Sequence, residues 1–155
     1  MKAFFTRIAP WAILLAAFLG LADSVYLARS ELSGAPLLCN IDGLSGCNLV
    51  AQSPYSQLFG VPLAVYGLGF YALLFILAAL ELAWSSSRLR KMLLALTLFG
   101  VAVSLVSLLL QLFVIQALCI YCAFSWAVAL LAWLFSRLLP GSKFWRREHL
   151  TDAPS

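Results

Sequence analysis

The sequence predicts an all-α integral membrane protein, a four-transmembrane-helix bundle with a long outer loop that carries a short surface helix. Its 155 residues are 64% hydrophobic and 10% charged, with a mean hydropathy of +1.00, whereas soluble domains are about half apolar. Four apolar stretches are long enough for a hydrocarbon core of about 30 Å. They cover residues 8–28, 61–83, 92–116 and 118–139. One bundle therefore uses nearly the whole chain and leaves an outer loop (29–60) and a polar tail (140–155), with no fused thioredoxin-like domain.

The basic residues predict the orientation of these spans. Nine of the ten fall on one side and only Arg29 falls on the other; the nine are Lys2, Arg7, Arg88, Arg90, Lys91, Arg137, Lys143, Arg146 and Arg147. The positive-inside rule then places both termini and the 84–91 connection in the cytoplasm and the 29–60 loop outside. We take the chain as bacterial, which predicts the inner (cytoplasmic) membrane. The net charge of +4 follows from this topology and does not indicate nucleic-acid binding.

The first span could also be read as a cleaved signal peptide, because basic residues precede it and "GLA" resembles a cleavage site. The apolar run is too long for that reading, and small residues recur in it at every fourth position. They are Ala12, Ala16, Gly20, Ser24 and Ala28. Such a stripe lets helix backbones approach closely in lipid, so we expect this helix to be retained.

The 29–60 loop is longer than an ordinary connection, and loops of this length are usually functional or disordered. Turn residues at Asp42-Gly43 and Ser45-Gly46 would bring Cys39 and Cys47 together. The residues after Gly46 predict a short helix at the membrane surface, limited by Pro54. Pro62 suits the opening turn of the second span.

All four cysteines, Cys39, Cys47, Cys119 and Cys122, fall on the predicted outer side, where disulfides form and persist. A structural disulfide remains an alternative for the loop pair. It explains "CIYC" poorly, because C-x-x-C is the recurrent redox spacing. A zinc site is a weak alternative, since C-x7-C is a poor half-site and His149 lies in the predicted cytoplasmic tail. We therefore expect no metal.

Cys119 and Cys122 lie at the predicted start of the fourth span. Unpaired N–H groups and the helix dipole favour a thiolate there, whereas burial opposes it. This position at the bilayer edge suits electron transfer to a lipid-soluble quinone. The loop pair would collect electrons from a soluble protein by thiol–disulfide exchange.

These features resemble the vitamin K epoxide reductase (VKOR) family in its bacterial form, over about residues 18 to 135. The resemblance rests on the loop cysteines, on Ser53 six residues after Cys47, on "FGVPLAVYGLGFY" and on "CIYC". It implies a four-helix bundle around a quinone site, with ubiquinone or menaquinone as acceptor. It also implies that Cys39 exchanges with a thioredoxin-like disulfide oxidase, Cys47 relays to Cys119, and Cys122 faces the quinone.

The resemblance also suggests quinone-binding residues. Ser53 matches a loop serine of the family, although a turn or capping serine is an equal alternative. Leu63 stands where many members have asparagine, and Trp126 stands where vertebrate members have tyrosine. Both differences favour a respiratory quinone over vitamin K epoxide, and Trp126 would stack on the ring or simply pack. Gln116 is the fourth candidate, because it is close to Cys119 in the chain.

Other polar residues fall within the predicted spans. Asp23 is either a functional carboxylate or an interfacial one that reaches water. Ser104, Ser107 and Gln111 share a helix face and either line the site or hydrogen-bond between helices; we favour the second.

The predicted function is that of a membrane thiol:quinone oxidoreductase that drives disulfide bond formation. One alternative is the other bacterial four-helix disulfide-generating family, in which C-x-x-C lies in the first outer loop. A second alternative is a non-enzymatic membrane scaffold stapled by two disulfides.

Overall fold

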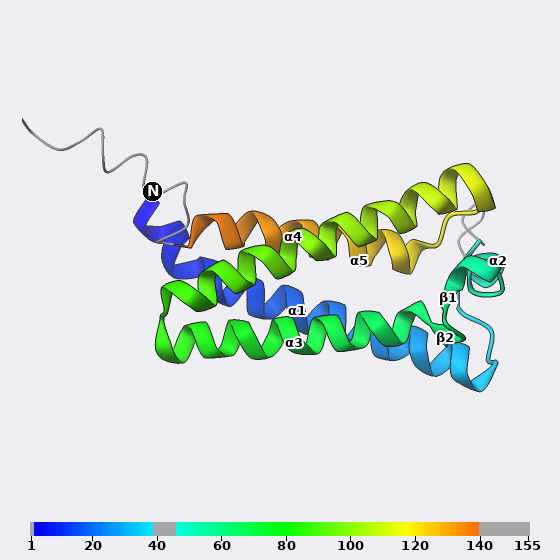
Figure 1. Cartoon of the computed structure of the whole chain (residues 1–155), viewed down its shortest axis with the longest axis horizontal. Coiled ribbons are helices and arrows are strands. Elements are labelled where there is room, and N and C mark those ends of the chain that lie inside the picture. The colour runs from blue at the N-terminus through cyan, green and yellow to red at the C-terminus, as the bar shows by residue number, and fades with distance from the viewer. Residues whose placement is uncertain (1, 39–45, 140–155) are drawn as a thin grey trace, which may run out of the picture.

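The computed structural model describes residues 2–38 and 46–139, with side chains from residue 8 onward, and confirms the fold class. Four long helices form a bundle (Figure 1): α1 (Lys2–Ser33), α3 (Leu63–Trp84), α4 (Ser87–Leu110) and α5 (Ile120–Leu138). They give four segments that are long and apolar enough to cross a membrane. Cys39, the Asp42-Gly43 turn, Lys143, Arg146, Arg147 and His149 lie outside the described residues.

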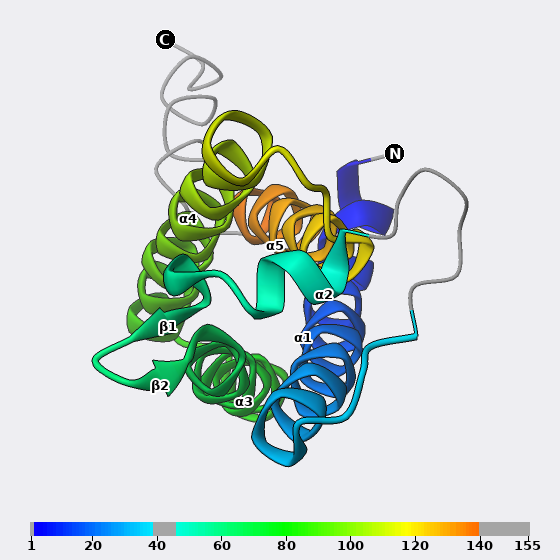
Figure 2. The same ribbon diagram turned by 90° about the vertical axis from the view of Figure 1, so that its right-hand side faces the viewer.

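Short elements close one end of the bundle. The helix α2 (Cys47–Ala51) is the predicted surface helix, and Figure 2 shows that it crosses this end. Pro54 does not continue it but begins a separate 3-10 turn, η1 (Pro54–Ser56). A hairpin of β1 (Gln57–Leu58) and β2 (Val61–Pro62) follows, which the sequence analysis did not predict. Its two-residue turn, Phe59 and Gly60, has positive φ at both positions, as right-twisted hairpins require.

The observed helix ends differ from the predicted ones for local reasons. Helix α1 runs five residues beyond 28 and stops where Gly34 takes a positive φ of 67°. Helix α3 starts two residues after 61, because Val61 and Pro62 belong to the hairpin. Helix α4 starts at Ser87 instead of 92, because the Ser86 side chain caps it by accepting from the Arg88 N–H.

The connection from α4 to α5 is also more structured than predicted. The last turn of the third span widens into a π-helix, η2 (Gln111–Ile115), which ends at Gln116 in the left-handed conformation. Residues 116–119 then lead to α5, with Cys119 as its N-cap. The span predicted from 118 therefore begins at Ile120.

Small residues let the helices approach closely, as the stripe in the first span predicts. Ala16, Gly20, Ser24 and Ala28 are buried. A Cβ on Gly20 would lie 2.2 Å from the Tyr71 ring of α3, and one on Gly67 would lie 3.1 Å from the Ser24 hydroxyl. Hence the Tyr71 ring packs directly on the α1 backbone at Gly20, and only the small Ser24 side chain separates the two backbones at Gly67.

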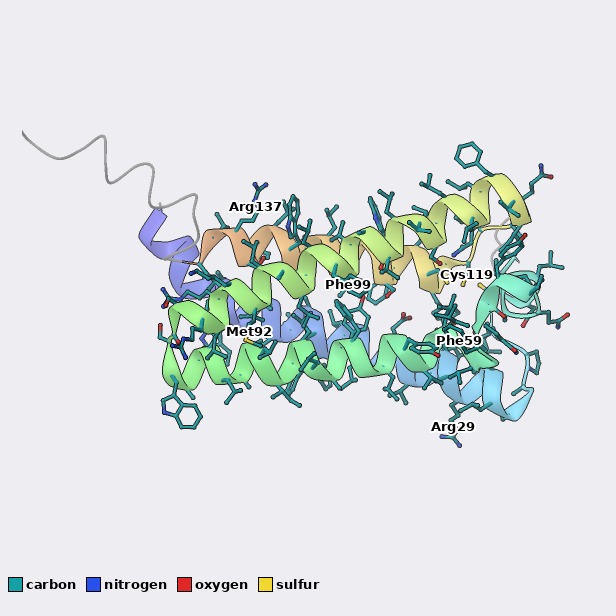
Figure 3. All side chains as sticks on the ribbon, viewed as in Figure 1. Arg29, Phe59, Met92, Phe99, Cys119 and Arg137 are labelled. Carbon is teal, nitrogen blue, oxygen red and sulfur yellow. The ribbon has the colours of Figure 1, made fainter. Side chains whose placement is uncertain are left out.

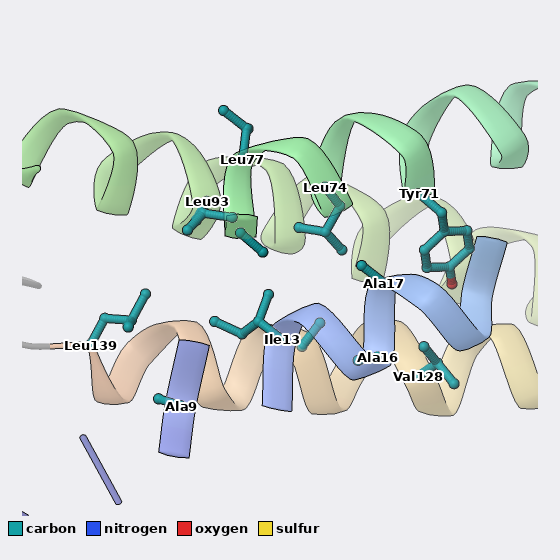
Figure 4. Close-up of a cluster of buried hydrophobic side chains, with 12 residues drawn as sticks. Ala9, Ile13, Ala16, Ala17, Tyr71, Leu74, Leu77, Leu93, Val128 and Leu139 are labelled. Carbon is teal, nitrogen blue, oxygen red and sulfur yellow. The ribbon is translucent and has the colours of Figure 1, made fainter. Parts of the chain in front are cut away.

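The apolar core lies where α1, α3, α4 and α5 meet. Figure 4 shows Tyr71 and Leu74 of α3 directed toward α1, near Ile13 and Ala17. Across the bundle, the Tyr71 hydroxyl donates to the Ser125 carbonyl at 2.9 Å. This bond ties α3 to α5 in the half of the bundle that carries the cysteines.

The charged residues separate to the two ends of the bundle. In Figure 3, Arg29 lies at the same end as Cys119, and Arg137 lies at the opposite end. The first turns of α4, which carry three basic residues, are at the Arg137 end. This separation is the one on which the predicted orientation depends.

Candidate redox site

Cys119 lies where α5 begins, and its surroundings favour a thiolate. The residue is 2% exposed, and Cys119 and Cys122 are both free thiols. The pKa of Cys119 is lowered, first because the Cys122 thiol hydrogen-bonds its sulfur and also because the backbone N–H groups of Cys122 and Tyr121 do. Burial opposes this effect but does not outweigh it. The helix N-terminus therefore acts on Cys119 in the predicted sense.

Gln111 holds the connection that presents Cys119. Its side chain is 1% exposed, and its Oε1 accepts a hydrogen bond from the Cys119 N–H at 2.9 Å. Its backbone carbonyl accepts from the Ala117 N–H at 3.2 Å. The sequence favours a bond between helices for Gln111, and the observed bond runs from the end of the third span to the N-cap of α5.

Cys47 is brought to the same buried cluster by close packing of α2. Cys47 is fully buried and disulfide-bonded, and it shares an apolar cluster with Cys119, Leu27 and Leu37. A Cβ on Gly46 would lie 2.8 Å from the backbone N and O of Leu118. Gly46 is therefore the residue that allows α2 to lie against the start of α5.

The segment that leads to Cys39 is also fixed against the bundle. Asn48 pairs with the backbone of Leu37, accepting from its N–H at 2.9 Å and donating to its carbonyl. The Leu38 N–H donates to the Tyr26 hydroxyl at 3.2 Å, and the Tyr121 hydroxyl donates to the Leu38 carbonyl at 3.0 Å. The two tyrosine rings pack together with centroids 5.2 Å apart. Tyr121, the third residue of "CIYC", thus joins α5 to the residue before Cys39.

The four predicted quinone-binding residues have different environments. Ser53 is half-buried, and its hydroxyl donates to the Val50 carbonyl at 2.7 Å, a turn interaction at the end of α2. Leu63 and Gln116 are exposed. Trp126 is half-buried on α5, four residues after Cys122, and its Nε1 is buried. Their role toward a quinone stays a prediction.

The other polar residues of the spans differ in their effect on the thiols. The Cys122 hydrogen bond has the largest effect on the pKa of Cys119, and the Asp23 carboxylate opposes it. Asp23 is half-buried, as are Ser104 and Ser107. Among the described residues, no three His, Cys, Asp or Glu side chains gather as metal ligands would.

The surroundings of Cys122 fit a quinone in one respect. Two buried side-chain N–H groups, Gln111 Nε2 and Trp126 Nε1, have no hydrogen-bond partner within residues 8–38 and 46–139. Buried donors are rarely left unpaired, so such groups call for a ligand or a water. A quinone is apolar and carries two carbonyl acceptors, which matches this pair of donors.

A polar groove of about 380 Å³ lies on the same end of the molecule. Its lining comes from the end of α1, the residues after it, α2 and β1, and includes Ser30, Glu31, Leu37, Asn48, Gln52 and Gln57. It borders the backbone that continues to Cys39. Leu37 belongs both to this groove and to the apolar cluster around Cys47 and Cys119, so the two adjoin.

The fold and the site together define a helical membrane protein with a reduced thiol pair at one end of a four-helix bundle. The vitamin K epoxide reductase (VKOR) family model matches residues 11–136, so the chain belongs to this family. Membership makes the protein, in general terms, a membrane oxidoreductase that acts on thiols and quinones, and members of the family generally use quinones as electron carriers. Comparison with curated proteins finds no match.

Several residues of the site were missed by the sequence analysis. Gly46, Asn48, Tyr26 and Tyr121 position the loop and α5. The sequence singles out Gly46 only as a turn residue and Tyr121 only as part of "CIYC". Asn48 directly follows Cys47, which is the one signal that would have drawn attention to it.

Proposed function

We propose that this protein reoxidises a thioredoxin-like partner outside the cytoplasm and passes the two electrons to a membrane quinone. The observation that carries the proposal is the burial of Cys47 and Cys119 in one cluster, against the free Cys122. Such an arrangement suits a relay from the outer loop to the bilayer edge. Free thiols at 119 and 122 do not suit a scaffold stapled there, and a C-x-x-C that begins the last helix does not suit the alternative four-helix family.

The relay proceeds by two exchanges. A thiolate of the reduced partner attacks the Cys39–Cys47 disulfide at Cys39, and the mixed disulfide resolves to oxidised partner and a reduced loop pair. The Cys47 thiolate then attacks the Cys119–Cys122 disulfide at Cys119. Cys122 leaves as a thiolate, and Cys39 resolves the Cys47–Cys119 bond, which leaves the α5 pair reduced.

The last step returns the α5 pair to its disulfide. Cys119 and Cys122 together give up two electrons and two protons, which the quinone accepts to become a quinol. Trp126 and the surroundings of Cys122 would hold the acceptor, and Ser53, Leu63 and Gln116 stay candidates at its edge. The groove beside Leu37 would give the partner a surface next to the backbone that continues to Cys39.

Turnover measured with two different electron donors distinguishes the role of the loop cysteines from that of the α5 cysteines. With Cys39→Ala, we expect turnover driven by the protein partner to fall much further than turnover driven by a small dithiol such as dithiothreitol. The small dithiol reaches later thiols directly, whereas the partner depends on Cys39. Equal loss with both donors would contradict the proposed order of the relay.

A further inference from the structure

The Gln111 amide is anchored through its oxygen, whereas its nitrogen lacks a strong acceptor. Its Oε1 accepts the Cys119 N–H at 2.9 Å, and the whole side chain is 1% exposed. Only the oxygen of an amide can accept this bond, so the assignment of O and N is fixed by the Cys119 N–H. Because the amide is planar, Nε2 is then directed away from that N–H as a donor.

This donor is buried and has only a weak acceptor beside it. Among the described residues Nε2 makes no regular hydrogen bond, and the polar atom that it faces is the Cys122 sulfur, a weak acceptor. A buried donor left unpaired costs about 1–3 kcal/mol. Trp126, one helical turn beyond Cys122, carries a second such donor in Nε1. Two buried donors that lack a strong protein acceptor, in an apolar span, suit a ligand that is apolar and brings acceptor oxygens.

We propose that Gln111 is a quinone-binding residue, whose Nε2 donates to a quinone carbonyl oxygen beside Cys122 while its Oε1 holds Cys119 at the start of α5. This inference rests on the proposed function. One side chain then aligns both the thiol pair and its electron acceptor. The π-helix contributes because it places Gln111 within reach of the Cys119 N–H.

Binding can be measured without turnover in the Cys119→Ala/Cys122→Ala protein. The probe is menadione, a naphthoquinone with two carbonyls, and its affinity is measured by isothermal titration in detergent. We expect Gln111→Met to weaken binding about tenfold, the effect of one lost hydrogen bond of about 1.4 kcal/mol. Trp126→Phe should weaken it about fivefold. Trp133→Phe, on the same helix but under the Arg137 guanidinium at 4.7 Å, should leave it unchanged.

A second ligand shows whether weaker menadione binding results from a lost hydrogen bond or from a change in the shape of the pocket. The hydrocarbon 2-methylnaphthalene has the same rings without carbonyls, so its affinity should be the same with and without Gln111→Met. Equal weakening of both ligands, or no weakening of menadione, would overturn the inference. Failure of the unmutated Gln111 protein to bind any quinone would instead overturn the proposed function.

Should Gln111→Met fail to fold, infrared spectroscopy gives an independent test. The carbonyl stretch of bound menadione is compared with that of menadione in detergent, in the Trp126→Phe protein. A hydrogen-bonded band at lower frequency should persist there, because the Gln111 donor remains. Two unshifted carbonyl bands would rule out the proposed contact.

Discussion

The two ends of the bundle differ in how completely their buried polar groups are hydrogen-bonded. At the turn between α3 and α4, Glu81 is 5% exposed, and both of its oxygens are paired. One accepts from Arg90 Nε at 2.6 Å and the other from the Ser86 N–H at 3.2 Å, while Arg90 also bonds Ser85. At the cysteine end, two thiols are free and two buried N–H donors have no partner within the described residues.

This difference separates a structural end from a functional one. A buried carboxylate is tolerated when an arginine and a backbone N–H satisfy it, and the result is a fixed turn. Unpaired donors and free thiols add no such stability. Their presence at one end only, among the described residues, indicates that this end is arranged for ligands and for exchange.

The largest effect is expected for Cys47→Ala, which removes the link between the loop and α5. Turnover driven by the protein partner should be lost completely. Mixed with the oxidised partner, the lone Cys39 thiolate should attack the partner's disulfide and form a mixed disulfide, which no loop thiol is left to resolve. Non-reducing gels of the mixed proteins detect this species. If no such species forms while the partner is present, Cys39 is not where the partner exchanges.

Arg90→Met tests the structural end. Removing one partner of a buried ion pair leaves Glu81 uncompensated and should cost about 3 kcal/mol of folding stability. Arg88→Met is the matched control, since Arg88 is exposed on the same turn. Stability is followed by thermal unfolding in detergent. Quinone turnover per folded molecule should be unchanged. A loss of turnover without loss of folding would show that this end also takes part in the reaction.

Gly46→Ala tests how α2 is held at the functional end. The added Cβ would meet the Leu118 backbone at 2.8 Å, so α2 must move away from Cys119. We expect partner-driven turnover to fall about tenfold, with dithiol-driven turnover nearly unchanged. Gly69→Ala is the control, because a Cβ there meets nothing within 4 Å. Equal rates for the two variants would show that close contact of α2 is not required.

The smallest effect concerns the ionisation of Cys119. A lowered pKa means that its thiolate persists to lower pH than that of an ordinary cysteine, so alkylation should stay fast as the pH falls. In Cys122→Ala the hydrogen bond from the neighbouring thiol is lost. The pH at which the alkylation rate of Cys119 reaches half of its maximum should therefore rise. Alkylation of Cys119 by iodoacetamide is followed by mass spectrometry against pH. An unchanged half-maximal pH would show that Cys122 does not stabilise the thiolate.

Hydropathy and spacing were enough to predict the spans and the position of the thiol pair. Apolar length defines a membrane helix almost by itself, and a stripe such as Ala16, Gly20 and Ser24 is visible in the sequence. These features are local, so a single chain shows them directly. The structure bears them out at α1 and at the Gly20–Tyr71 contact.

The residues around the thiols were harder to predict, because they depend on irregular backbone and on distant pairs. The π-helix changes which side chains face inward, so Gln111 is buried while Gln116, nearer in the chain, is exposed in a left-handed conformation. Tyr26 and Tyr121 are far apart in sequence, yet their rings pack together and both hydroxyls bond the Leu38 backbone. Neither relation leaves a periodic signal.

The central claim is that the cysteine end passes electrons from a protein dithiol to a quinone through Cys122. Its most direct test is anaerobic quinone reduction by the purified protein, given a reduced thioredoxin-like donor, with Cys122→Ala beside the unmutated chain. The account predicts quinol formation by the unmutated chain and none by the variant. Equal quinol formation by both, or none by a folded unmutated chain with either ubiquinone or menaquinone, would contradict it.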